Sequence, residues 1–164
     1  MPRYIEKIRV PVRLARIDAP PEPGTMALAP YAELHAGPET LLERLNAPTH
    51  VVPFQLPDSD VVLLIMRPHI EWVDADEGVE PRLVRPATYR ATSQELVRVH
   101  MAGGESFEGV LAIEMPDETN RASDYLNGDD MFFPLRMPAG TRLVNKLRVV
   151  DVLVRRAVTL PRAA

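Results

Sequence analysis

The chain has 164 residues, of which 46% are hydrophobic and 26% charged, a composition typical of a folded globular protein rather than a disordered one. A formal charge of −4 and an aromatic content of 5% disfavour nucleic acid as a partner, because phosphate-binding surfaces concentrate positive charge. The absence of cysteine excludes disulfide bonds, thiolate zinc sites and cysteine nucleophiles.

The first part of the chain is predicted to be rich in strands. Apolar and polar residues alternate from Ile8 to Leu14, which is typical of a half-buried strand. Residues 38–46 fit a short helix, with Pro38 at its first position and Asn46 at its exit. The further strands expected here are 25–29, 50–56, 61–66 and 69–74.

Residues 75–92 are polar and contain Pro81 and Pro86, so we expect a stiffened linker there. Beyond it, one helical turn is expected at 120–127, with Ser123 or Asp124 as its N-cap. The strands expected after the linker are 96–101, 107–113, 131–136, 141–145 and 148–154.

The chain contains an internal repeat. The segment His50–Pro57 aligns with Met131–Pro138 at an offset of 81 residues, and the same offset pairs Leu45-Asn46 with Leu126-Asn127. We therefore predict an all-β fold with short helical turns, internally duplicated as tandem small β-barrels of the SH3 or Sm type. The expected modules are residues 4–74 and 93–156, joined by the linker at 75–92.

The second module carries three short motifs: R-x-S-D-x-L-N at 121–127, F-x-P-L at 132–135, and Asn145-Lys146. In this pattern, residues 94–154 resemble an uncharacterised bacterial family of small β-barrel domains. The hairpin in this module is also similar, more weakly, to the start of an Sm-like barrel. The resemblance implies a small barrel and no particular activity.

A ligand-binding cluster is predicted in the second module at Ser123, Asp124, Asn145 and Lys146, where Lys146 would supply charge and Ser123 and Asn145 would donate hydrogen bonds. The same residue types also serve as helix caps and turn residues, and this structural interpretation is favoured. The first module is expected to have apolar residues near 64–65 in place of Asn145-Lys146, so it would be structural.

The longest apolar run, Val61–Met66, is apolar on both faces. A strand covered on both sides would explain the run, and so would an interface to another module or subunit. On the second interpretation, the interface residues are Val61, Leu63 and Ile65.

No catalytic, cofactor or metal site is predicted. The four histidines share no metal-ligand spacing, and neither a phosphate-binding glycine loop nor a G-x-S-x-G elbow occurs. The start of the chain lacks the apolar core of a secretory signal, and the longest apolar run is far short of the ~20 residues that span a membrane. We therefore expect a cytoplasmic protein that is not an enzyme and has no membrane segment.

These observations favour a non-enzymatic protein–protein interaction or scaffold module of a bacterial cytoplasmic assembly, with a protein partner or self-association. The alternative is a sensor module that binds a small ligand, a nucleotide or RNA through the predicted cluster.

Overall fold

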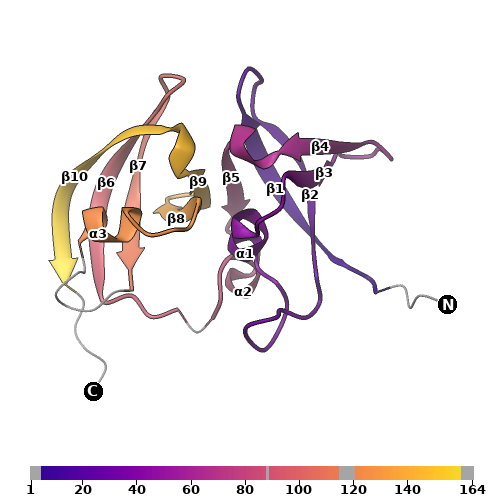
Figure 1. Ribbon diagram of the computed structural model, residues 1–164, viewed down its shortest axis with the longest axis horizontal. Coiled ribbons are helices and arrows are strands. Elements are labelled where there is room, and N and C mark those ends of the chain that lie inside the picture. The colour runs from indigo at the N-terminus through magenta and orange to yellow at the C-terminus, as the bar shows by residue number, and fades with distance from the viewer. Residues whose placement is uncertain (1–4, 88, 115–120, 160–164) are drawn as a thin grey trace.

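The computed structural model describes residues 5–87, 89–114 and 121–159, with side chains as far as Arg155. Ten antiparallel strands form one open sheet, with short helices beside it (Figure 1). The predicted all-β fold with short helical turns is confirmed. The strands are β1 (Ile8–Arg16), β2 (Glu22–Leu28), β3 (Val51–Gln55), β4 (Val62–Met66), β5 (Ile70–Asp76), β6 (Ser93–Met101), β7 (Ser106–Ile113), β8 (Phe132–Met137), β9 (Gly140–Asn145) and β10 (Val149–Thr159). The helices are α1 (Leu41–Asn46), α2 (Pro81–Val84) and α3 (Ala122–Leu126), with 3-10 turns η1 (Arg67–His69) and η3 (Lys146–Arg148).

The strand order is β10-β6-β7-β8-β9-β5-β1-β2-β3-β4. The first half of the molecule (β1 to β5 with α1) therefore reads β5-β1-β2-β3-β4, and the second half (β6 to β10 with α3) repeats this order. The proline-marked segments 50–57 and 131–138 hold the same place, at β3 and β8. The halves are not two separate closed barrels, because pairing between β5 and β9 joins them into one sheet that ends at β10 and β4.

Strand registers and loop contacts also recur, which defines a counterpart in one half for many residues of the other. The amide of Arg67 donates to the His50 carbonyl at 2.9 Å, and that of Lys146 donates to the Met131 carbonyl at 2.8 Å. Arg67 is thus the counterpart of Lys146. The expectation that apolar residues near 64–65 stand there was wrong by two positions.

Two glycines occupy counterpart positions where neighbouring strands approach closely. Gly24 pairs with Val12, and Gly109 pairs with Val97. A Cβ atom at Gly24 would lie 2.2 Å from the Phe54 ring, and one at Gly109 would lie 2.6 Å from Leu135. No side chain fits at either glycine, so these two residues permit the tight curvature of each half.

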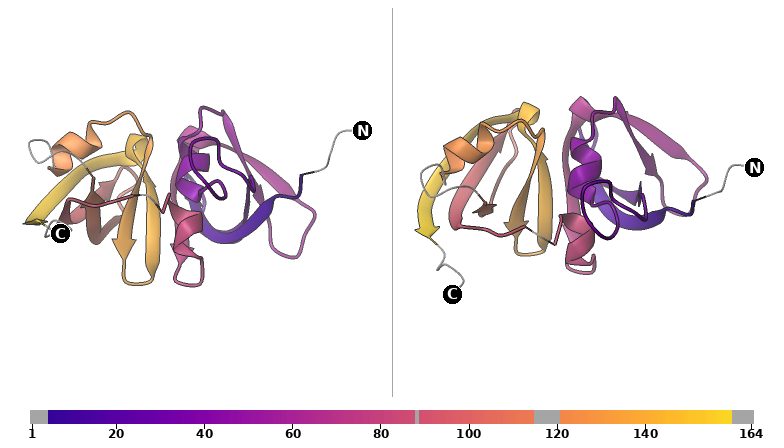
Figure 2. Two further views of the ribbon diagram at one scale, coloured as in Figure 1. Left: turned by 90° about the horizontal axis from the view of Figure 1, so that it is seen from below. Right: turned by 60° about the horizontal axis from the view of Figure 1, so that its bottom comes forward.

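Each half curls on itself (Figure 2). Each half also has its own apolar core, and the joining strands β5 and β9 contribute to both cores. Phe132 and Leu143 of the second half lie in the first core. Ala15 and Trp72 of the first half lie in the second core. Side chains of adjacent residues on a strand point to opposite faces, which is how β5 and β9 can serve two cores at once.

Helix starts differ from the sequence prediction. Helix α1 begins at Leu41 after the N-cap Thr40, which forms a capping box with Glu43, so Pro38 lies outside the helix. Helix α3 begins at Ala122, and the residue before it makes no side-chain cap. Neither Ser123 nor Asp124 is the N-cap, because both lie within the helix. The expected linker at 75–92 includes the end of β5 and all of α2.

Candidate functional site

Asn145, from the predicted ligand-binding cluster, is fully buried where the two halves meet. Its Nδ2 donates to the carbonyls of Pro68 (3.2 Å) and Ile70 (2.8 Å), and its Oδ1 accepts from the amide of Leu147 at 2.9 Å. These bonds leave the side chain turned into the protein rather than toward a ligand. Asn145 ties β9 to the start of β5.

Lys146 lies at the surface next to Asn145, but its ammonium group also has a structural contact. Lys146 Nζ donates to the Gly128 carbonyl at 3.0 Å, and burial lowers the pKa of this lysine. In the first half, the Arg67 guanidinium donates to the carbonyls of Thr49 (2.9 Å) and Leu45 (3.2 Å). In both halves, therefore, a basic side chain holds the loop that leads from the helix to the next strand.

Ser123 is exposed and Asp124 half-buried, both in the first turn of α3. Within the described residues, no hydrogen bond or ion pair joins either of them to Asn145 or Lys146. The structure therefore brings Asn145 and Lys146 together only as neighbours in sequence, and each contacts protein backbone. A ligand-binding role for the four residues stays a prediction.

The described residues contain no group of three or more potential metal-ligating side chains. His35 Nε2 lies 2.7 Å from Glu43 Oε1, and His100 Nδ1 lies 3.1 Å from Asp151 Oδ1. Each of these histidines thus pairs with a single carboxylate. None of the helices that the structure describes is long and apolar enough to cross a membrane.

An ion pair lies at the seam between β5 and β9, with Arg142 buried and Asp74 half-buried. Arg142 donates to both carboxylate oxygens of Asp74, at 2.7 and 2.9 Å. The Arg142 guanidinium also lies over the Trp72 ring, 3.7 Å from its centroid, and the indole Nε1 donates to Glu105 Oε2 at 3.1 Å. A planar guanidinium suits both contacts, because it can stack on a ring while it donates in its own plane. These polar contacts thus fix the register of β5 against β9.

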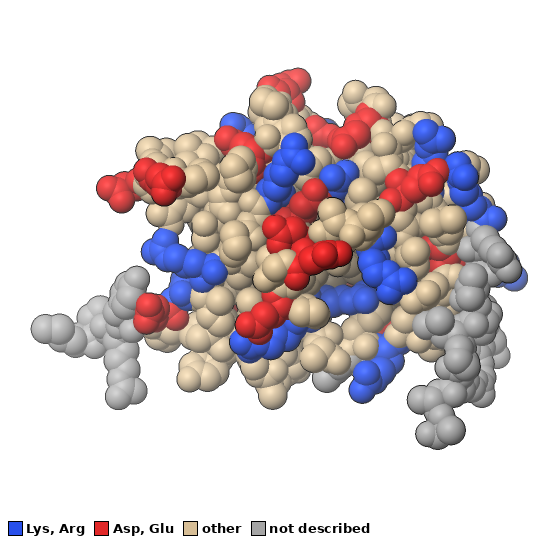
Figure 3. Space-filling model, turned by 180° about the vertical axis from the view of Figure 1, so that it is seen from behind, with Lys and Arg blue, Asp and Glu red and all other residues tan. Residues whose placement is uncertain are grey.

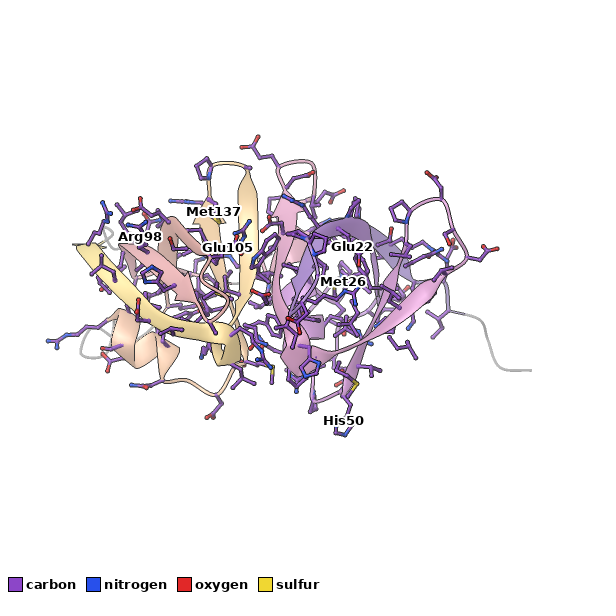
Figure 4. All side chains as sticks on the ribbon, turned by 90° about the horizontal axis from the view of Figure 1, so that it is seen from above. Glu22, Met26, His50, Arg98, Glu105 and Met137 are labelled. Atoms are coloured by element: carbon purple, nitrogen blue, oxygen red, sulfur yellow. The ribbon has the colours of Figure 1, made fainter. Side chains whose placement is uncertain are left out.

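A groove of about 700 Å³ opens beside this ion pair, between β1 and β2 on one side and the β8–β9 turn on the other. Its apolar lining includes Pro11, Pro23 and Met137, and Figure 4 labels Met137 in the second half. Arg13 is among its charged lining residues. Sequence reasoning missed this groove, because its residues come from separate segments with no shared spacing.

The two strands at the ends of the sheet expose apolar side chains. Strands β4 and β10 lie at opposite ends of the molecule (Figure 1), and among the described residues each pairs with one neighbouring strand. Leu64 is 65% exposed and Leu153 is 54% exposed, although both are large apolar residues in regular strands. Among the side chains that the structure describes, the other large apolar residues exposed at these ends are Val61, Val62, Met66, Val150 and Val154.

The residues predicted as an interface lie on the first of these strands or next to it. Val61 is exposed and Leu63 is half-buried, while Ile65 is only 6% exposed and belongs to the first core. The open face of β4 instead carries Leu64 and its alternate neighbours. The sequence run could not distinguish the faces, because both are apolar.

Charge does not gather on the face shown in Figure 3, where acidic and basic side chains are interspersed.

Comparisons with known protein families, with curated proteins and with solved structures gave no match.

Proposed function

We propose that this protein is a non-enzymatic interaction or scaffold protein of a bacterial cytoplasmic assembly, and that it binds protein chains through its sheet edges. The observation that carries this proposal is the exposure of apolar side chains on both end strands, β4 and β10. An unpaired edge offers free backbone donors and acceptors, and exposed apolar patches mark protein interaction sites. A partner strand could satisfy both at once.

The proposal includes an origin by internal duplication of a small SH3- or Sm-like barrel, with modules at 4–74 and 93–156. The repeated strand order supports it, and so do the counterpart glycines Gly24 and Gly109. On this hypothesis each half is an open barrel with two edge strands: a β5-type edge, which is β5 or β10, and a β9-type edge, which is β9 or β4. Pairing between β5 and β9 joins the two halves. One edge of each type remains free.

Site-specific photo-crosslinking in living cells tests the edge proposal. A benzophenone amino acid at Leu64 or at Leu153 is expected to capture protein adducts. The matched control is Leu34, which is 91% exposed but lies in the loop between β2 and α1 rather than on an end strand. Adducts from the edge positions and none from the control support the proposal. Adduct patterns identical at all three positions would contradict it.

A second candidate function, a small-ligand, nucleotide or RNA sensor, is favoured by the groove of about 700 Å³. Its lining combines apolar surface with Arg13 and Arg142, as ligand sites commonly combine them. Trp72, the chain's single tryptophan, lies beneath Arg142 and can report binding by fluorescence. Titration with ATP, GTP and a short single-stranded RNA should quench or enhance this signal and raise the melting temperature. No change at millimolar concentration eliminates these ligands, and Arg13→Ala should abolish a genuine response.

A further inference from the structure

We infer that the partner at the sheet edges is a second copy of this chain, bound head to tail. In this contact β10 of one copy pairs antiparallel with β4 of the next, in the register that β5 and β9 already use inside the molecule. The inference rests on the proposed edge-binding function and specifies the partner.

The internal seam supplies the template for this contact. Strand order makes β10 the counterpart of β5 and β4 the counterpart of β9. The chain therefore ends in one free edge of each type that the seam joins. Two copies placed end to end would bring a β5-type edge against a β9-type edge. Such a contact is heterologous, so it extends into a closed ring or a filament.

The ion pair at the internal seam is replaced by leucine on both free edges. Asp74 pairs with Arg13, and its counterpart Leu153 pairs with the counterpart arginine, Arg98. By the same comparison of β8–β9 with β3–β4, the counterpart of Arg142 is Leu63. In the inferred register, Leu153 of one copy faces Leu63 of the next. Both members of a charged pair have become apolar, so the two edges complement each other.

The neighbouring positions agree with this match. The internal pair Val73 and Leu143 corresponds to Val152 facing Leu64 of the next copy. Leu143 is fully buried, because it enters the core of the opposite half. Leu64 is 65% exposed in the single chain and would enter the second core of the neighbouring copy in the same way. Burial of such side chains from water favours association.

One charged residue on the edge, which pairs with His100 in the single chain, also meets a basic residue of the next copy. Asp151 is the counterpart of Trp72, which lies in the second core together with Met101. The counterpart of Met101 is Arg16, whose Nε is buried and has no hydrogen-bond partner among the described residues. Docking in the template register brings Asp151 of one copy toward Arg16 of the next. An unsatisfied buried donor in the single chain would thereby gain a carboxylate.

Engineered cysteines test the register directly, since the chain has none of its own. Purified Leu63→Cys and Leu153→Cys variants are mixed under mild oxidation. We expect a mixed disulfide dimer, because directly opposed residues of paired strands have Cβ atoms close enough to bridge. Leu34→Cys replaces Leu63→Cys in the matched control, which should not cross-link. Homodimers of either variant alone, at the yield of the mixture, would mean a symmetric edge contact and overturn the inference.

Sedimentation velocity on the full chain tests the association itself. Wild type is expected to form species larger than one chain, and Leu64→Lys should weaken association roughly tenfold or more by placing a charge in the contact. Leu34→Lys is the control and should associate as wild type does. A wild type that stays monomeric at high concentration overturns the inference. If Leu64 still cross-links other proteins in cells, the proposed function survives that result.

A charge rebuild separates loss of the contact from loss of the fold. Leu153→Asp and Leu63→Arg each place one member of the internal ion pair on an edge, and each alone should weaken association. The double variant recreates the pair across the contact between copies and should restore it. Thermal melting of each variant shows whether its chain is folded. Folded double variants that remain monomeric contradict the inferred register.

Discussion

The two halves of the molecule share a backbone plan but differ in the side chains at the seam. Both keep a glycine at the close approach of two strands, Gly24 and Gly109, because no Cβ fits there. At the end of the fourth strand, by contrast, the second half has the buried Asn145 and the first half has the exposed Met66. Only Asn145 faces another half within the chain. Backbone curvature therefore limits which residues can stand at corresponding positions of both halves. Contact between the halves limits only the residues that take part in that contact.

The comparison predicts equal and large losses at the two glycines. Gly24→Ala and Gly109→Ala should each lower the free energy of unfolding by about 3 kcal/mol, because neighbouring backbone blocks the new methyl group. Gly103→Ala is the control, since the nearest atom to its Cβ is 3.9 Å away. Urea unfolding followed by Trp72 fluorescence measures all three. A tolerated change at only one of Gly24 and Gly109 would break the equivalence of the halves.

Exchange of residues at the seam should be asymmetric. Asn145→Met removes three hydrogen bonds that its side chain makes to backbone groups and should cost roughly 2–4 kcal/mol. The reverse exchange, Met66→Asn, lies at an exposed position and should change stability by less than about 0.5 kcal/mol. Thermal and urea unfolding compare the two. Equal losses would show that the seam does not distinguish the halves.

Replacing both members of the ion pair at the seam should be tolerated, whereas replacing only one member should destabilise the protein. Asp74→Ala leaves the Arg142 guanidinium buried without its main carboxylate and should cost about 2 kcal/mol. The double variant Asp74→Leu with Arg142→Leu reproduces the residues of the free edges and should recover to within about 1 kcal/mol of wild type. Unfolding curves of the single and double variants decide this. If the double variant were as unstable as the single one, the stability of the seam would depend on its charged residues.

The smallest expected effect concerns helix α1, whose Glu43 pairs with His35. A hydrogen bond that His35 donates to the Glu43 carboxylate raises the pKa of His35 above its ordinary value. Stabilisation by this contact is therefore complete below about pH 6.5 and is lost as the pH rises through the raised pKa. His35→Gln should remove this dependence. Melting temperatures of both proteins across that range should differ most at the acidic end and converge at the basic end.

Local pattern predicted much of the fold. Alternation with a period of two and short apolar runs predict strands that lie within a few residues of β1 to β10, because both patterns record which sides of a strand are buried. The start of α1 was placed too early, because Pro38 suits a first helical turn but Thr40 with Glu43 completes the capping box. The residue at which a helix begins depends on capping hydrogen bonds, and several neighbouring residues could make such bonds.

The site residues were harder to predict than the strands. Asn145 and Lys146 belong to the predicted ligand-binding cluster, but the partners that the structure gives them are backbone groups that no motif identifies. The contact between Arg142 and Asp74 joins residues 68 positions apart and had no sequence signal. Distant pairs like this one arise from sheet register, which short spacing patterns do not encode.

The sequence by itself determined the strand positions, the short helices and the repeated segments, since each depends on neighbours a few residues away. Tertiary structure alone decided that β5 and β9 join the halves into a single open sheet, and that Leu64 rather than Ile65 faces outward. The reason is physical: a strand with two apolar faces can bury either one, and only the position of the rest of the sheet selects the face that enters the core.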